Sequence, residues 1–470
     1  MKGAISMMNM IIKKLSRSDF NRNSAIIIAS MILIYLFISL YFVNHCFFNT
    51  IINGVDVSLK AHDEVDEIIK SYIKDYKLQL IERNGEVEEI LGQEIEMQYN
   101  EKNSIYKIYG IQKPIIWIRA LLKKQRHYSG NIFLYNKEKL ETRINELNCL
   151  NINIVEPQNV SFKYSNGSYE VIEEIYGNKL YKDKLYEAVE VSILKGKTEL
   201  DLNENHCYEN PKYTLSSDKT PKTKSLLNKY VSTRIIYIFG SEIEILDANT
   251  ISQWLSVDEN LEVIINAKSV KEYVQDLSKK YDTVGIARKF KTSTKKIVEV
   301  KGGFYGWKIN RDGETIALIK NIKLGEILEK EPIYTQKALS RDGDDIGNTY
   351  VEINITRQQL WFYKGGKLIT KGAIVSGNPN KGNSTTLGVY MLNYKEKGSN
   401  LSGPNYEAEV TYWMPFNGNE GIHDASWRYS FGRDIYKRNG THGCINVRLH
   451  LAKKIFDNIQ VGTPIICYEE

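Results

Sequence analysis

The sequence predicts a multidomain chain: a single N-terminal transmembrane helix, two α+β repeat units, and a mainly-β C-terminal domain with one helix. Three observations predict this. An uncharged apolar run follows a basic N-terminal segment, a stretch of 21 residues recurs at an offset of 129 residues, and the last part of the chain changes to short strands separated by turns. We expect the parts to span residues 1–24, 25–46, 51–205, 206–345 and 348–470.

Length and composition are typical of folded domains. The chain has 470 residues, of which 42% are hydrophobic and 26% charged. The net charge is only +6 with both signs interspersed, so we expect no nucleic-acid partner. The five cysteines form no Cys-x-x-Cys pair and no zinc-like spacing, so we expect no metal and no cofactor. The sequence allows a disulfide between Cys149 and Cys207, but we favour buried free thiols.

The N-terminal segment has the features of a membrane anchor. Residues 1–24 carry five basic side chains and one acid, and Ala25 to Val43 form 19 uncharged residues, enough to cross a bilayer. The basic flank precedes the span, so we expect the N-terminus in the cytoplasm and the later domains outside the cell. The residues after the span, beginning at Asn44, lack the small side chains of a cleavage site, which favours an uncleaved anchor over a signal peptide.

Periodicity and turn residues predict the elements of the first repeat. They are a short strand and turn at 53–57, a helix from Asp63 to Tyr76, a hairpin over 78–91, a helix after Pro114, a helix over 137–147 and a hairpin over 160–173.

The repeat itself aligns Tyr176–Gly196 with Tyr305–Gly325, with seven identities in 21 positions and no gap. Each copy has a Tyr-Gly turn, an aspartate expected to cap a helix (Asp183 or Asp312), and a final glycine suited to a C-cap. We therefore expect residues 51–345 to hold two copies of one α+β unit. The polar segment 340–348 is predicted to be a linker.

The last domain is predicted to be a barrel or sandwich of short strands with one amphipathic helix. The strands are expected near 349–355, 360–363, 368–376, 389–392, 408–413, 421–423 and 464–468, and the helix at Leu449–Ile459.

Cysteine and histidine in this domain suggest nucleophilic acyl chemistry. Cys444 lies in Thr441-His442-Gly443-Cys444, and a second histidine, His423, lies upstream. His442 is two residues from Cys444, where a direct hydrogen bond along an extended segment is awkward. We therefore assign His423 as the base and His442 as a supporting residue. A backbone carbonyl or the Asp424 carboxylate would orient His423.

The loop around Cys444 offers further groups. The N–H groups of Gly443 and Cys444 are candidates for an oxyanion hole, and Thr441 and Asn446 can fix the loop by hydrogen bonds. A helix starting near Arg448 would place its positive N-terminal dipole close to the thiol.

These residues resemble the L,D-transpeptidase catalytic domain of bacterial cell-wall enzymes. The signature is a histidine, here His423, then 17 residues, then Thr441-His442-Gly443-Cys444-Ile445-Asn446. Ser376-Gly377 and Thr385-Thr386-Leu387-Gly388 are similar to its strand-end turns. Asp424 stands where many members have glycine, and Thr386 or Leu387 stands near a usual proline. The repeats resemble, more loosely, a peptidoglycan-binding module of spore-forming Gram-positive bacteria.

The resemblance implies a two-step acyl transfer on peptidoglycan stem peptides. Cys444 would form a thioester with a donor tetrapeptide, and the amine of a second stem would resolve it to a diaminopimelate-to-diaminopimelate crosslink. Asn446, Arg448, Trp427, Arg428 and Asp424 are the expected substrate-binding residues. Two alternatives stay open: an L,D-carboxypeptidase, and a wall-binding scaffold with a dormant site. The sequence does not indicate an oligomeric state.

Overall fold

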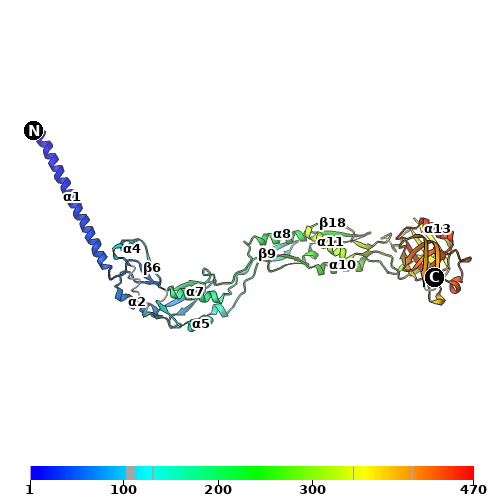
Figure 1. Cartoon of the computed structure of the whole chain (residues 1–470), viewed down its shortest axis with the longest axis horizontal. Coiled ribbons are helices and arrows are strands. Elements are labelled where there is room, and N and C mark those ends of the chain that lie inside the picture. Colours follow the sequence, from blue (N-terminus) through cyan, green and yellow to red (C-terminus); the bar gives the residue numbers. More distant parts are fainter. Residues whose placement is uncertain (1, 102–111, 130–131, 342, 404–405) are drawn as a thin grey trace. The chain divides into compact units, whose positions relative to one another are not determined.

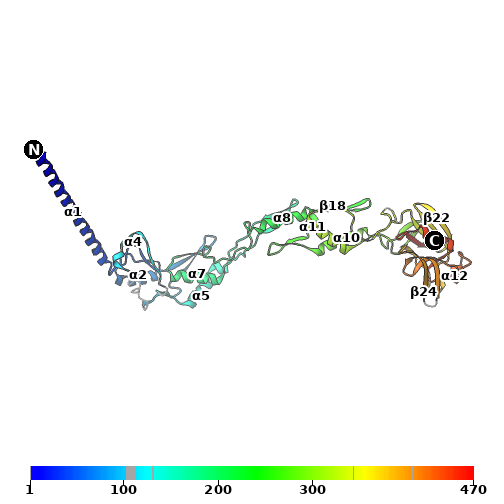
Figure 2. The ribbon, with the colours of Figure 1, turned by 45° about the horizontal axis from the view of Figure 1, so that its top comes forward.

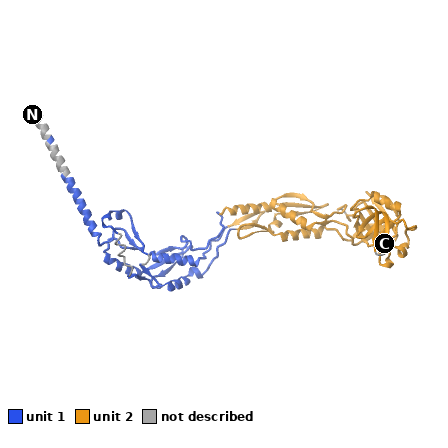
Figure 3. Cartoon of the chain, viewed as in Figure 1, with its two compact units in different colours: residues 1–160, 173–216 blue, residues 161–172, 217–470 orange. Residues whose placement is uncertain are grey.

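The computed structural model describes residues 2–101, 112–129, 132–341, 343–403 and 406–470. The chain forms two compact units, coloured separately in Figure 3. The first unit contains residues 1–160 and 173–216, and the second contains 161–172 and 217–470.

The predicted N-terminal apolar helix is present as α1 (Lys2–Tyr41). Within it, the 20-residue segment Arg22–Tyr41 is long and apolar enough to cross a membrane. Nearly all of its side chains are exposed, as expected for a helix that does not pack into a soluble core.

The first unit builds its core around a small sheet and three helices. The strand order is β10-β3-β4, with β10 parallel to β3 and β4 antiparallel to it. Buried aliphatic side chains of α2, α5 and α7 form one cluster with these strands. The elements are β1 (Thr50–Ile52), β2 (Val55–Asp56), α2 (His62–Lys74), β3 (Lys77–Ile81), β4 (Val87–Leu91), β5 (Gln98–Tyr99), η2 (Pro114–Ile116), α4 (Ile118–Leu122), β6 (Gln125–His127), β7 (Phe133–Leu134), α5 (Lys137–Asn145), α6 (Asn148–Asn151), α7 (Lys182–Leu194) and β10 (Glu199–Asp201).

The second repeat has the same plan. Its sheet has the order β12-β11-β18, again with one antiparallel neighbour and one parallel strand that follows a helix. Helices α10 and α11 lie side by side in both Figure 1 and Figure 2. The elements are α8 (Lys219–Val231), β11 (Arg234–Phe239), β12 (Glu242–Leu246), α9 (Ala248–Ser252), β13 (Leu255–Val257), β14 (Val263–Ile265), α10 (Ala267–Tyr281), β17 (Lys308–Ile309), α11 (Arg311–Leu324), β18 (Ile327–Lys330) and β19 (Tyr334–Gln336).

The helix caps differ from the sequence prediction. The cap of α11 is Asn310, whose side chain accepts from the Gly313 N–H, and the cap position of α7 is Tyr181. Asp183 and Asp312 lie in the first turn instead, where a carboxylate still interacts favourably with the helix dipole. The expected C-terminal glycine of α11, Gly325, has the left-handed conformation (φ 71°).

Two hairpins of the second unit pack against different parts of it. One packs against the second repeat and the other packs against the last domain. The predicted hairpin β8 (Ser161–Ser165) and β9 (Ser168–Ile172) contributes Tyr169 to the core of the second repeat. The hairpin β15 (Arg288–Lys291) and β16 (Ile297–Val300) contributes Phe290 and Val300 to a cluster that includes Ile466 and Tyr468 of the last domain.

The last domain is a sandwich of two sheets. The five-stranded sheet has the order β22-β21-β20-β28-β23, and the four-stranded sheet has the order β24-β25-β26-β27. Side chains of both sheets and of α13 form one buried cluster. The elements are β20 (Tyr350–Asn354), β21 (Gln359–Lys364), β22 (Lys367–Ala373), η3 (Pro379–Lys381), β23 (Gly388–Met391), β24 (Glu396–Gly403), β25 (Tyr406–Asn417), β26 (Glu420–Asp424), α12 (Ile435–Asn439), β27 (Ile445–Val447), α13 (Leu449–Asn458) and β28 (Pro464–Tyr468). The short helix α12 was not expected, because its five residues are too few for a periodic pattern.

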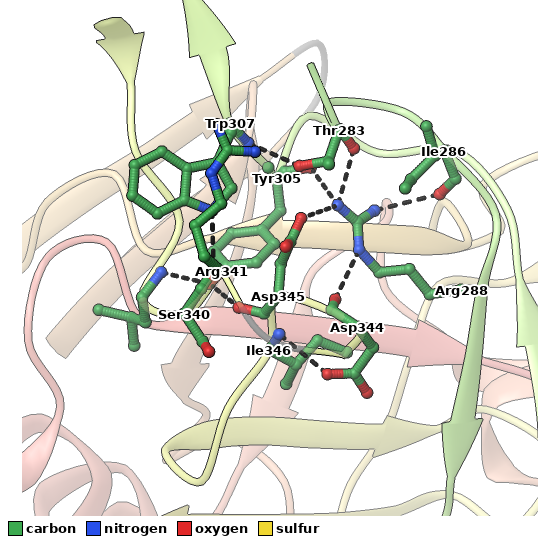
Figure 4. A network of polar contacts seen from close by, with 12 residues as sticks. Thr283, Ile286, Arg288, Tyr305, Trp307, Ser340, Arg341, Asp344, Asp345 and Ile346 are labelled. Atoms are coloured by element: carbon green, nitrogen blue, oxygen red, sulfur yellow. Dashed lines mark hydrogen bonds and ion pairs between the residues drawn. The ribbon is translucent and has the colours of Figure 1, made fainter. Parts of the chain in front are cut away.

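In the segment 340–348, predicted to be a linker, Asp345 and Ile346 are instead buried at a junction with neighbouring elements (Figure 4). The Arg288 guanidinium donates to the carbonyls of Thr283 and Asp344 and pairs with the Asp345 carboxylate at 3.3 Å. Both side chains of the pair are nearly inaccessible, at 2% and 6% exposure. The polar composition suggested a flexible connection here, but Asp345 of this segment is buried in a pair with Arg288.

Backbone contacts join the second repeat to the last domain directly. The Tyr305 N–H donates to the Val389 carbonyl of β23, and the Val389 N–H donates to the Gly302 carbonyl. Gly303 is the residue that permits this approach, since a Cβ there would lie 2.0 Å from the Val389 oxygen. Buried Glu352 of β20 accepts from the Ser293 N–H at 2.8 Å.

We expect Asp345→Asn to lower the free energy of unfolding of the second unit by about 3 kcal/mol, because it leaves the buried Arg288 charge without its counter-ion. Asparagine tolerates the positive φ of this position (66°), so backbone strain does not contribute. Hydrogen exchange of peptides from 283–307 in increasing urea would measure the loss. The matched control is Asp312→Asn in the exposed pair with Lys271, expected to cost no more than about 0.5 kcal/mol. Equal effects of the two variants would contradict a stabilising role for the buried pair.

Candidate active site

Parallel pairing of β26 with β27, the last strand of the four-stranded sheet, places the predicted base and nucleophile on neighbouring segments. His423 of β26 is opposite Asn446 of β27, and Cys444 immediately precedes β27. The loop before β27 is anchored from the other side by the segment after β22, where the Thr441 N–H donates to the Ser376 carbonyl and the Asn378 N–H donates to the Thr441 carbonyl. Both ends of the 441–446 loop are therefore fixed.

Hydrogen bonds inside the loop use several of its polar groups. The Thr441 hydroxyl donates to the Cys444 carbonyl at 2.6 Å and accepts from the Gly443 N–H at 3.1 Å. The Thr385 hydroxyl donates to the Gly443 carbonyl at 2.7 Å. Gly443 has φ 122°, and a Cβ there would meet the Glu420 carboxylate at 2.9 Å. Of the two expected oxyanion donors, the Gly443 N–H is therefore engaged with Thr441, while the Cys444 N–H has no acceptor among the described residues.

His423 is 4% exposed and bonded at both ring nitrogens. Its Nδ1 lies 2.8 Å from the Asp424 carbonyl oxygen, and its Nε2 lies 2.9 Å from the Asn446 side-chain nitrogen. Burial lowers the pKa of His423, and the nearby Arg428 charge acts in the same direction, which outweighs the opposing effect of Asp424. The imidazole is therefore neutral near pH 7.

The Cys444 thiol is partly exposed and points to a backbone carbonyl, with Sγ 3.3 Å from the Asn419 oxygen. Burial raises the pKa of Cys444 to about 11, and the Glu420 carboxylate adds to the increase. The expected activation by a helix dipole is not visible in this resting state, because β27 separates Cys444 from the first residue of α13. The thiol is protonated at neutral pH.

Two cavities meet at Cys444. The larger, of about 590 Å³, also contacts His423, Arg428 and Asn446. The smaller, of about 400 Å³, is bounded mainly by polar residues of the β24–β25 hairpin, among them Glu396 and Asn400. Cys444 and Leu401 line both cavities, so the sulfur can be approached from two directions.

The other predicted substrate-binding residues have different surroundings. Trp427 and Arg428 line the larger cavity. Asp424 is buried, and its carboxylate accepts from the N–H groups of Thr411 and Tyr412 instead of facing a cavity. Arg448 stacks on the Phe431 ring at 5.1 Å and lines neither cavity.

His442 also lines the larger cavity, beside Thr441. The role of His442 as a supporting residue stays a prediction.

Several residues at the site were not anticipated. Glu420 accepts from the Thr386 N–H and hydroxyl beside Gly443, and Glu407 and Glu409 form an acidic side of the larger cavity. The strand expected near 408–413 is part of the longer strand β25, which pairs with the unpredicted strand β24. The alternation of residues 406–417 is a strand signal that extends the predicted 408–413 strand in both directions.

Within the part of the chain that the structure describes, the group able to hold a metal ion is Glu82, Glu88 and Cys149, far in sequence from this site. The Glu88 carboxylate in this group accepts hydrogen bonds from the N–H groups of Asn148 and Cys149. Its position is therefore explained by capping of the N-terminus of α6. All five cysteines are free thiols, including Cys149 and Cys207.

Comparison with known proteins agrees with this geometry. The model of the L,D-transpeptidase catalytic domain matches residues 348–467, and the model described as "Putative peptidoglycan binding domain" matches 89–201 and 214–327. A solved L,D-transpeptidase of Enterococcus faecium, a cysteine-to-serine mutant, is 34% identical over 98% of its own length and 52% of this chain, with a TM-score of 0.44. The chain belongs to the L,D-transpeptidase family.

Other L,D-transpeptidases match about a quarter of this chain. The catalytic domain of the E. faecium enzyme, solved by NMR, is 38% identical, and 97% of it aligns with 26% of this chain (TM-score 0.24). An L,D-transpeptidase of Mycobacterium tuberculosis is 19% identical over 58% of its length and 26% of this chain, also with a TM-score of 0.24. No curated protein matches the chain.

The raised pKa of the Cys444 thiol gives a measurable pH dependence. Only the thiolate reacts with iodoacetamide, so we expect alkylation of Cys444 to keep accelerating up to about pH 11 instead of levelling near 9. Glu420→Gln removes a negative charge that opposes the thiolate and should make alkylation at pH 8.5 about two- to fivefold faster. Peptide mass spectrometry separates Cys444 from the four buried thiols.

The matched control is Glu409→Gln, a charge change on the cavity wall that should leave the rate unaltered. A wild-type rate that levels near pH 9, or an equal effect of the two glutamine variants, would refute this account of the thiol.

Proposed function

We propose that this L,D-transpeptidase forms diaminopimelate-to-diaminopimelate crosslinks in peptidoglycan through a Cys444 thioester, with His423 as the base. The observation that carries the proposal is the position of Cys444 where two cavities meet, the larger of which is also lined by the buried neutral His423. The E. faecium relative described as acylated by ertapenem supports acyl transfer to the protein in this family.

The first half-reaction would be acylation. The Cys444 S–H proton passes to His423 Nε2 as sulfur bonds to the carbonyl carbon of the donor stem, and the imidazolium then protonates the departing D-alanine amine as the C–N bond breaks. Because the resting thiol is protonated, this proton transfer has to accompany the attack. The Cys444 N–H is available to the developing oxyanion.

The second half-reaction needs an acceptor amine at the thioester. The acceptor attacks the carbonyl carbon, gives up a proton, and the S–C bond breaks to restore the thiol. We assign the larger cavity to the acyl chain and the smaller, polar cavity to the acceptor, where the Glu396 carboxylate would attract an ammonium group. Separate approaches allow the amine to enter while the acyl chain stays bound.

The remaining parts of the chain suit a substrate outside the cell. We propose that Arg22–Tyr41 anchors the protein in the membrane, with the N-terminus in the cytoplasm and both units facing the wall. The two repeats would hold peptidoglycan near the catalytic domain, in line with the family description of residues 89–201 and 214–327.

Incubation of the full-length protein with purified disaccharide-tetrapeptides tests the activity. Wild type should yield crosslinked dimers and release D-alanine, whereas Cys444→Ala should lower both by at least about 10³-fold because no thioester forms. His423→Gln should be nearly as impaired, and His442→Gln less so. Dimer formation by Cys444→Ala at the wild-type rate would refute the proposal; mass spectrometry measures each product.

Hydrolysis by the same thioester is the alternative outcome, and the smaller cavity separates the two reactions. Ser402→Trp places a bulky side chain on an exposed position of that cavity. We expect it to lower the ratio of dimer to trimmed tripeptide several-fold while Cys444 is still acylated by a carbapenem. Ser426→Trp on the larger cavity is the matched comparison and should reduce acylation itself. A wild-type product that is tripeptide alone would favour an L,D-carboxypeptidase.

A further inference from the structure

Arg428 is one of the expected substrate-binding residues, but two of its guanidinium nitrogens donate hydrogen bonds within the protein. Nε donates to the Asn446 Oδ1 at 2.7 Å, and Nη1 donates to the Asn439 carbonyl at 2.6 Å. Asn446 in turn contacts His423 Nε2 at 2.9 Å. Arg428 thus acts on His423 through one intervening side chain.

The chemistry of these groups determines which atom is donor and which is acceptor in the bonds that link Arg428, Asn446, His423 and the Asp424 carbonyl. A guanidinium has donors only, so Asn446 must present its oxygen to Arg428 and its NH₂ group to His423. The NH₂ group is also a donor only, so His423 Nε2 must be the unprotonated, accepting nitrogen. On the other side of the ring, the Asp424 carbonyl can only accept, so Nδ1 must carry the proton.

The other groups around the ring do not reverse this order. The Trp413 and Trp427 rings flank His423 at centroid distances of 5.8 and 6.1 Å. The Asp424 carboxylate is occupied by two N–H groups of β25. Arg428 is the charged side chain that opposes a second proton on the ring, while Asp424 partly favours one.

We propose that Arg428 and Asn446 are positioning residues that fix His423 as the neutral Nδ1–H tautomer, with Nε2 as the unprotonated, accepting nitrogen. The proposal rests on the proposed role of His423 as base, but it concerns the state of the ring before any reaction. A histidine in the opposite tautomer would carry a proton on Nε2 and could not accept one from the thiol there.

The same contacts assign a step to Asn446. The Asn446 NH₂ group occupies the lone pair that the thiol proton needs, and it cannot donate to Nε2 once that nitrogen is protonated. The amide therefore has to leave Nε2 as the substrate aligns. Its bond to Arg428 keeps the oxygen anchored during this movement.

Long-range ¹H–¹⁵N spectra of the full-length protein, labelled with ¹⁵N-histidine, read the tautomer directly. We expect His423 of the wild type to show a pyrrole-type Nδ1 and a pyridine-type Nε2 near pH 7, with the signal assigned by its loss in His423→Gln. Arg428→Lys retains a donor-only side chain and should keep this pattern. Arg428→Met should give a mixture of tautomers, and Arg448→Met, a change at an arginine outside both cavities, should not.

Asn446→Asp is the sharpest variant, because a carboxylate can accept from both neighbours. It should protonate Nε2 and raise the pKa of His423 by about 1–3. Acylation of Cys444 by a carbapenem at pH 7 should then fall by about tenfold or more and recover as the pH rises. Arg428→Met should instead slow acylation with no alkaline shift of the profile.

A wild-type spectrum with the proton on Nε2 would overturn the proposal, as would a single Nδ1–H tautomer retained in Arg428→Met. If the tautomer is as expected but His423→Gln crosslinks as fast as wild type, the proposed function of His423 fails while the tautomer assignment stands.

Discussion

The register between β26 and β27 is the constraint on which the active site depends. The two strands are parallel, with His423 opposite Asn446 and Ile422 opposite Ile445. Because side chains alternate between the faces of a sheet, a slip of one residue would turn Asn446 away from His423 and bury the polar groups in the apolar core. The buried neighbours Ile422, Ile445 and Val447 oppose such a slip. Apolar burial thus holds a polar contact in place.

A second constraint links the catalytic domain to the repeat that precedes it. The loop at Gly302–Tyr305 pairs with β23, and the chain just before β23 contains Thr385 and Thr386, which bond the Gly443 carbonyl and Glu420. Ser293 of the β15–β16 hairpin reaches Glu352 on the same sheet. The second repeat and the catalytic domain therefore meet in a buried cluster separate from both of their cores. The repeat supports the sheet that contains β23.

Much of this could be predicted from the sequence. Sequence alternation and turn residues located most strands of the last domain. The 129-residue offset indicated two repeats, whose central sheets have the same topology. The spacing of His423 and Cys444 indicated the site. The failures have physical causes. Segment 340–348 looks like a linker because its composition is polar, but Asp345 finds its partner, Arg288, 57 residues earlier. No local pattern indicates that Arg428 donates a hydrogen bond to Asn446, 18 residues later on β27.

The high pKa of the Cys444 thiol has a consequence beyond catalysis. Oxidants and electrophiles react with thiolates far faster than with thiols. A protonated Cys444 therefore reacts slowly with both. Its reactivity would appear only when a ligand excludes water and the imidazole takes up the proton. The choice of which ligands react with Cys444 would then depend on the timing of one proton transfer as much as on the shape of the cavities. Without a ligand, the protein would keep its thiol intact during long exposure to oxidants and electrophiles.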